Sequence, residues 1–257
     1  MIYSYKELRR WLGAVKRNHR VWRVCDHPMN DEPGVILRHD IDLDLDAAHR
    51  LARIERDIGV TSSYFVLLGC PTYNLFTPDN QQRVRDMVEW GFDVGLHFDP
   101  APYGQASDDV LQKHCEREAV ILSGITNHPI RSVSIHNPSV CGRYPLFQGF
   151  ANAYDPRIFN EDIYLSDSRL HFRHNPTTFI DRAVDGPVQI LLHPMHYSDE
   201  GSGYAHIFET FITQYVNDAD NAWRVNSGYC DALPMPLRTH LATAWHNAGT
   251  PKGERNG

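Results

Sequence analysis

The chain has 257 residues, of which 42% are hydrophobic and 22% charged, and its formal net charge is −7. This composition is ordinary for a globular protein, and the length suits one α/β barrel, since such barrels use about 200 to 250 residues. The acidic balance without a basic cluster argues against a nucleic-acid partner, and no apolar run approaches the ~18 residues of a membrane span.

Strand and helix patterns alternate along the chain. Residues 4–16 have amphipathic helical spacing with Ser4 as the cap, and further helices are expected at 46–58, 77–91 and 107–122. Short apolar segments between them predict strands at 34–38, 63–68, 92–96 and 131–135. Residues 138–179 are rich in aromatic residues, Pro and Asn, with a strand at 163–165; a strand at 187–192 and a helix at 204–216 follow. This alternation predicts a parallel α/β barrel or a doubly wound sheet.

Residues suited to metal binding or proton transfer follow four of the predicted strands. They are His39, Asp40 and Asp42 after the first, His97 and Asp99 after the third, and His136 and His193 after later strands. The carboxyl ends of parallel strands share one face, so these side chains are expected to converge there. A single such histidine is more often a buried structural residue, but four strand ends together favour a divalent metal site and hydrolysis of an amide or ester. Asp44 and Asp46 are instead interpreted as helix-capping residues.

The motifs at these strand ends resemble those of a known family. Arg38-His39-Asp40-Ile41-Asp42, the segment from Gly95 to Ala101, and Ile190-Leu191-Leu192-His193-Pro194 occur in order between Val35 and Tyr197. They are similar to the NodB-type polysaccharide deacetylases, the family-four carbohydrate esterases, in a bacterial branch with HDxD in place of TFDDG. The resemblance implies a single distorted (β/α) barrel domain of parallel strands over residues 1–248, and residues 249–257 are expected to form a flexible polar tail.

The resemblance also implies roles for individual residues. Asp40 would be the catalytic base and Asp42 a metal ligand, or the two would be exchanged. His97 matches the first histidine of the second motif, whereas Ala101 stands where the second histidine is expected. His136, in the place of the arginine of the third motif, is the candidate for the missing ligand. The alternatives for that ligand are Asp99, His193 and His196.

The later motifs imply the acid and the substrate contacts. His193 would protonate the leaving amine, and Asp167, in a segment similar to the fourth motif, would orient it. Candidate substrate-binding residues are Asn137, Tyr73, Asn74 and Arg173, although a surface ion pair is an equal interpretation for Arg173. The candidate aromatic residues for stacking on a sugar, with core packing as the alternative for most, are Tyr73, Phe98, Tyr103, Tyr144 and Tyr197.

The expected function is a metal-dependent hydrolase, with zinc as the cofactor, that removes an acetyl group from an N-acetylated sugar or a related glycan precursor. Residues 1–10 lack the features of a secretory signal, so a cytoplasmic location and a nucleotide-linked or lipid-linked sugar are expected. The alternatives are hydrolysis of another amide or a phosphoester, and a non-catalytic glycan-binding relative that lost activity through Ala101. A nucleotide-binding protein is disfavoured, since neither GxGxxG nor GxxxxGK[ST] occurs.

Overall fold

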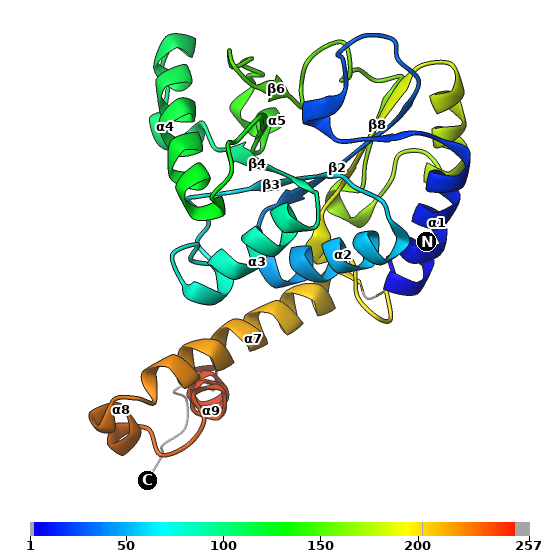
Figure 1. Cartoon of the computed structure of the whole chain (residues 1–257). Helices are drawn as coiled ribbons and strands as arrows, with labels where there is room; N and C mark the ends of the chain where they lie inside the picture. The colour runs from blue at the N-terminus through cyan, green and yellow to red at the C-terminus, as the bar shows by residue number, and fades with distance from the viewer. Residues whose placement is uncertain (1–2, 202, 250–257) are drawn as a thin grey trace. The chain divides into compact units, whose positions relative to one another are not determined.

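The computed structural model describes residues 3–201 and 203–249 (Figure 1). The chain divides into two compact units, Met1–Gly203 and Tyr204–Gly257. Residues 204–248, which the sequence analysis includes in the barrel domain, fall in the second unit of this division, and their membership of that domain stays a prediction. Of the predicted tail, residues 250–257 lie outside the described residues, and Gly249 ends the last helix.

The first unit is built around one parallel sheet. Its strands run in the order β6-β5-β4-β3-β2-β8-β7, every neighbouring pair is parallel, and β1 pairs with β2. The sheet is curled and carries helices, which confirms the predicted barrel-like α/β fold. The strands are β1 (Val21–Trp22), β2 (Gly34–Ile41), β3 (Ser63–Val66), β4 (Asp93–Phe98), β5 (Ser132–Ile135), β6 (Ala151–Asn152), β7 (Tyr164–Ser166) and β8 (Pro187–Leu192).

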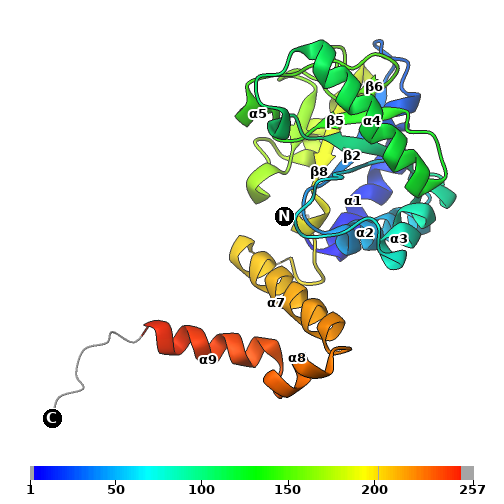
Figure 2. The same ribbon diagram turned by 90° about the vertical axis from the view of Figure 1, so that its left-hand side faces the viewer.

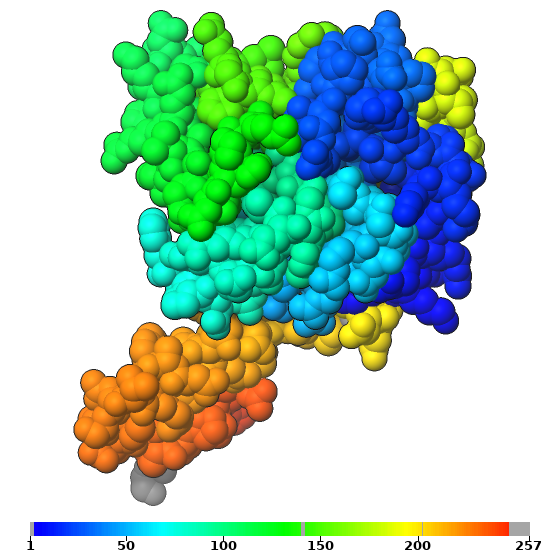
Figure 3. Space-filling view, in the orientation of Figure 1, coloured from blue at the N-terminus to red at the C-terminus, as the bar shows by residue number. Residues whose placement is uncertain are grey.

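The four predicted helices of this unit begin and end close to their expected positions, at α1 (Tyr5–Asn18), α2 (Leu45–Ile58), α3 (Pro78–Glu89) and α4 (Asp108–Thr126). Two short helices, α5 (Pro138–Cys141) and α6 (Pro176–Phe179), lie where no helix was predicted. Asp44 caps α2 by accepting a hydrogen bond from the Ala47 amide at 2.9 Å, as its position predicted, and Gly59 ends the helix at a positive φ of 75°. Helices α1, α2 and α3 lie side by side against the sheet in both ribbon views, and their side chains close over that face in the space-filling view (Figures 1, 2 and 3).

The two faces of the sheet differ because side chains alternate along each strand. On β2, Val35, Leu37 and Ile41 pack into the core that the helices complete. Arg38 and Asp40 point to the opposite, concave face, where polar side chains of neighbouring strands gather. Strand β2 is buried along its whole length, so its polar residues on the concave face need partners there.

Gly95 lets β4 lie close to its neighbours on the concave face. A Cβ atom there would lie 2.4 Å from Ser132 Oγ and 2.6 Å from the Phe65 ring. Only glycine fits between these side chains, which brings β4, with His97 near its end, close to β3 and β5.

The second unit contains α7 (Tyr204–Trp223), α8 (Ser227–Ala232) and α9 (Leu237–Gly249). Asp220 joins the three helices by accepting hydrogen bonds from the Tyr229 hydroxyl at 2.7 Å and the Leu237 amide at 3.1 Å. The sequence predicted only the first part of α7. Across the described residues, no helix has both the length and the apolar character needed to cross a membrane.

Candidate metal centre and active site

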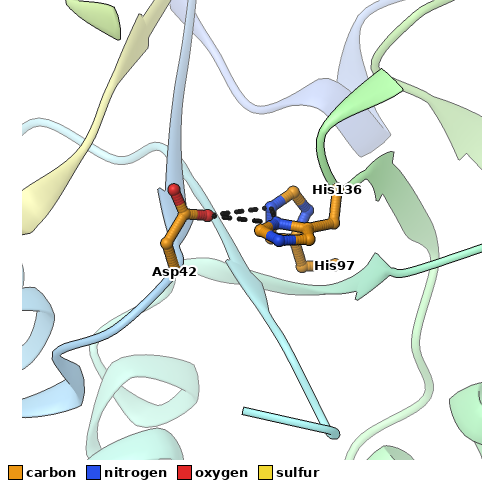
Figure 4. Close-up of side chains that lie close together, drawn as sticks. All are labelled: Asp42, His97 and His136. Carbon is orange, nitrogen blue, oxygen red and sulfur yellow. Dashed lines mark hydrogen bonds and ion pairs between the residues drawn. The ribbon is translucent and has the colours of Figure 1, made fainter. Parts of the chain in front are cut away.

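Three side chains from separate parts of the chain converge at the carboxyl edge of the sheet (Figure 4). Asp42 follows β2, His97 lies on β4, and His136 follows β5. Asp42 Oδ1 lies 3.2 Å from His97 Nε2 and 3.4 Å from His136 Nδ1, and the two nitrogens are 3.2 Å apart. Ligands held at about 2.1 Å around a tetrahedral ion are about 3.4 Å from one another, so these three atoms fit three corners of a zinc-type site.

The hydrogen bonds of the two imidazoles indicate which ring nitrogen carries the hydrogen and which is left to bind a metal ion. His97 Nδ1 lies 3.3 Å from the Ser134 carbonyl oxygen, which only accepts, so Nδ1 carries the hydrogen and Nε2 is left as a ligand. His136 Nε2 lies 2.8 Å from Asn137 Nδ2, which donates to it in this orientation of the amide. Turning the Asn137 amide over would place its oxygen there, so that Nε2 would carry the hydrogen of His136 and leave Nδ1 for an ion.

The electrostatics of this triad favour a cation. Burial opposes the charge of Asp42, yet hydrogen bonds from His136 and His97 hold the pKa of that carboxyl well below its usual range. Burial likewise opposes the charged form of His136, but the Asp42 carboxylate raises the pKa of this imidazole. The ionised carboxylate thus stabilises positive charge between the three side chains. A bound divalent cation would supply that charge in place of the protons on the imidazoles.

Asp40 lies beside the triad, and only one of its two carboxylate oxygens accepts hydrogen bonds from the described residues. Its Oδ2 accepts hydrogen bonds from Ser134 Oγ at 3.1 Å and from the Arg38 guanidinium at 3.4 Å, and lies 3.9 Å from His97 Nε2. Its Oδ1 is buried and has no hydrogen-bond partner among the described residues. Asp40 nevertheless lines the cavity. Burial opposes the charge of Arg38, but Asp40 raises the pKa of the guanidinium, which keeps a cation beneath this carboxylate.

On the other side of the triad, His193 is held by Asp167. Nδ1 of His193 lies 2.6 Å from Asp167 Oδ1, while His193 Nε2 lies 3.8 Å from Asp42 Oδ2. Burial disfavours the charged imidazole, but the Asp167 carboxylate outweighs it and raises the pKa of His193 to about 9. His193 therefore carries a proton at neutral pH, oriented by Asp167.

The triad, Asp40 and His193 line one cavity of about 220 Å³. Four aromatic rings form a wall of it, which we call the aromatic wall: Tyr144, Tyr154, Phe159 and Tyr164. Their ring centroids lie 4.7 to 5.5 Å apart in successive pairs. Asn137 also lines the cavity, as its predicted role requires.

Three residues predicted to contact substrate lie elsewhere. The Tyr73 hydroxyl is within 3.1 Å of the Ile41 and Leu67 carbonyls, so it ties two loops together and is turned away from the cavity. Asn74 accepts a hydrogen bond from the Phe76 amide in the turn before α3. Arg173 donates to the Glu161 and Tyr164 carbonyls. None of the three lines the cavity, because each is used by the backbone of its own loop.

The other residues considered for the third ligand have hydrogen-bond or ion-pair partners elsewhere. Asp99 accepts a hydrogen bond at 2.9 Å from the Ala101 amide, and His193 and His196 both contact Asp167. Ala101 is exposed at the start of a short 3₁₀ turn. His136 is the member of the candidate set that lies with Asp42 and His97.

Sequence reasoning missed several residues of the site. Tyr154, Phe159 and Tyr164 lie in the irregular region whose strands are short, so no periodic pattern marked which rings face the cavity. His196 lies 3.2 Å from Asp167, and the Tyr197 hydroxyl donates to the same carboxylate at 3.2 Å. These two residues were predicted from the sequence in other roles, His196 as an alternative metal ligand and Tyr197 as a candidate aromatic contact, and their contacts with Asp167 were missed.

No protein-family model and no curated protein matches the chain. Solved structures are similar to it. A chitin deacetylase from the fungal pathogen Colletotrichum lindemuthianum is 14% identical, with 76% of this chain and 86% of that chain covered and a TM-score of 0.44. A family 4 carbohydrate esterase from Streptomyces lividans in complex with acetate is 16% identical, with 72% and 91% covered and a TM-score of 0.41.

A CE4 family pseudoenzyme from Bacillus anthracis is also similar, at 16% identity and a TM-score of 0.41. The match covers 74% of this chain but 62% of that one, so the chain spans less than two thirds of the pseudoenzyme's length. The solved structures that resemble the chain thus come from the family whose motifs it resembles, as predicted. TM-scores below 0.5 at this identity carry no argument about activity or substrate, so the chemistry of the site alone supports a function.

Proposed function

We propose that the protein is a metal-dependent hydrolase that removes an acetyl group from an N-acetylated carbohydrate, with zinc as the metal. One observation carries the proposal: the Asp42, His97 and His136 triad lies between a carboxylate, Asp40, and a protonated imidazole, His193. A base and an acid on either side of one metal position are the groups that amide hydrolysis requires.

The chain's own residues divide the proton transfers. When bound, a divalent cation would lower the pKa of a water to about 7 and polarise the substrate carbonyl. Asp40 takes the proton from the attacking water, since it lines the cavity beside His97 and is held there by Ser134 and Arg38. His193 donates its Nε2 proton to the departing nitrogen, while Asp167 keeps the imidazole in place.

The lining of the cavity supports an uncharged sugar as substrate. The aromatic wall offers ring faces on which the apolar face of a sugar can pack. None of the described cavity-lining residues is Lys or Arg. Protonated His193 is the cationic side chain of the described lining, and its Nε2 lies 3.8 Å from the Asp42 carboxylate. We therefore favour a neutral glycan over the nucleotide-linked sugar and over a phosphoester.

The test is acetate release by the metal-free and the zinc-loaded protein. Chitooligosaccharides, a nucleotide-linked N-acetylglucosamine and an aryl phosphate would be supplied in parallel. The proposal expects zinc-dependent acetate release from the neutral oligosaccharide, lost in His193→Ala. Phosphate release alone would support the phosphoester alternative, and a protein that binds glycan without releasing acetate would be the non-catalytic relative.

A further inference from the structure

The carboxylate that orients His193 is itself braced by a second set of contacts. Asp167 is fully buried, and the His193 amide donates to both of its oxygens at 3.0 and 3.1 Å. The 3₁₀ turn Pro194–His196 then brings His196 and Tyr197 back to Oδ2, each at 3.2 Å. The orientation of the Asp167 carboxylate therefore depends on where this turn lies.

The N-terminal segment fixes the position of that turn. Ser4 and Ser198 form a parallel bridge, in which the Ser198 amide donates to the Tyr3 carbonyl at 3.2 Å and the Tyr5 amide donates to the Ser198 carbonyl at 2.9 Å. The Tyr3 ring packs at 5.8 Å from the Tyr197 ring and at 6.4 Å from the His196 ring. Tyr3 and Tyr197 are both nearly fully buried.

We propose that Tyr3, Ser4, Tyr197 and Ser198 form an N-terminal clasp, and that Tyr3 and Tyr197 are positioning residues for the Asp167–His193 pair. The Tyr197 hydroxyl restrains rotation of the carboxylate, and Tyr3 holds the Tyr197 ring against it. The catalytic consequence rests on the proposed role of His193 as the acid. The structural consequence does not depend on that role: the clasp fixes the hydrogen bond from His193 Nδ1 to Asp167 Oδ1, in which the two atoms are 2.6 Å apart.

Three variants of the full chain test the clasp. Tyr197→Phe removes one hydroxyl and keeps the ring, and Tyr3→Leu removes the aromatic contact. Tyr5→Phe is the matched control. It removes the hydroxyl of a buried tyrosine in the same segment, and the described structure gives Tyr5 no hydrogen bond to Asp167. The readouts are zinc content, kcat and KM for acetate release, and the NMR signal of the His193 Nδ1 proton in the metal-free protein.

In Tyr197→Phe and Tyr3→Leu, kcat is expected to fall roughly tenfold, the loss of about one hydrogen bond to a charged group, with KM and zinc content unchanged. The His193 proton signal should shift or broaden in both, and Tyr5→Phe should match the wild type. If Tyr197→Phe leaves both kcat and this signal as in the control, the clasp is refuted. If the wild type releases no acetate, the proposed function fails, and the NMR signal still decides the clasp.

Discussion

Replacing Asp167 by Asn tests the acid in most detail. Burial lowers the pKa of His193, and Asp167 is the chief cause that raises it, so that the net result is a rise from 6.5 to about 9, or roughly 3 kcal/mol in favour of the charged imidazole. Without that carboxylate the pKa should return to about 6.5 or lower. At about pH 8 the protonated fraction then falls from roughly 0.9 to 0.03, so kcat should fall at least roughly thirtyfold.

The assay is the pH profile of acetate release, paired with an NMR titration of the His193 imidazole. Because the raised pKa keeps His193 protonated up to about 9, Asp167→Asn should move the alkaline limit of activity to lower pH. Asp86→Asn is the control, since Asp86 forms a similar carboxylate–imidazole pair with His49, at 2.9 Å, outside the cavity. Wild-type kcat and an unchanged titration of His193 in Asp167→Asn would refute this account of the acid.

Four further outcomes are expected. His136→Ala should weaken zinc binding at least roughly 100-fold in a chelator competition, whereas Asp99→Ala should leave it unchanged. Asp40→Asn should lower kcat by roughly 10²- to 10⁴-fold with zinc content intact, as measured by single-turnover acetate release. Tyr144→Ala, which shortens the aromatic wall, should raise KM for a chitooligosaccharide roughly threefold to tenfold. The stabilising contribution of protonated His193, followed by urea unfolding of the metal-free protein, should be full below about pH 6.5 and lost as the pH rises through about 9.

The fold was predictable where hydrophobic patterns are regular. The apolar strand before Asp42 and the amphipathic helix after it follow from side-chain period alone, and the Asp44 cap and the Gly59 stop fixed the ends of α2. The two-residue alternation of a strand also explains the position of His39, which its residue type alone does not indicate. His39 lies between Arg38 and Asp40 in sequence, but alternation turns it to the helix side of β2.

There, the His39 imidazole is buried 2.9 Å from the Glu55 carboxylate, which also accepts hydrogen bonds from Ser62 and Tyr64. His39 is therefore structural, although it is next to Asp40, the proposed base. The distinction is physical, since a buried polar group on the helix side needs a partner on the facing helix.

The candidate site was predictable at strand ends and less so in loops. Asp42, His97 and His193 end or follow regular strands, so the parallel sheet brings them together. Tyr73 and Arg173 sit in irregular loops, where local backbone hydrogen bonds set the direction of each side chain. Those bonds have no periodic signature in the sequence.

The central claim is that Asp42, His97 and His136 hold one divalent ion between Asp40 and His193. Anomalous diffraction at the zinc edge, from crystals of the zinc-loaded protein, tests it directly. The account predicts one peak at about 2.0 to 2.2 Å from Asp42 Oδ1, His97 Nε2 and His136 Nδ1. A peak on the Asp167, His193 and His196 cluster instead, or no peak at the triad, would contradict it.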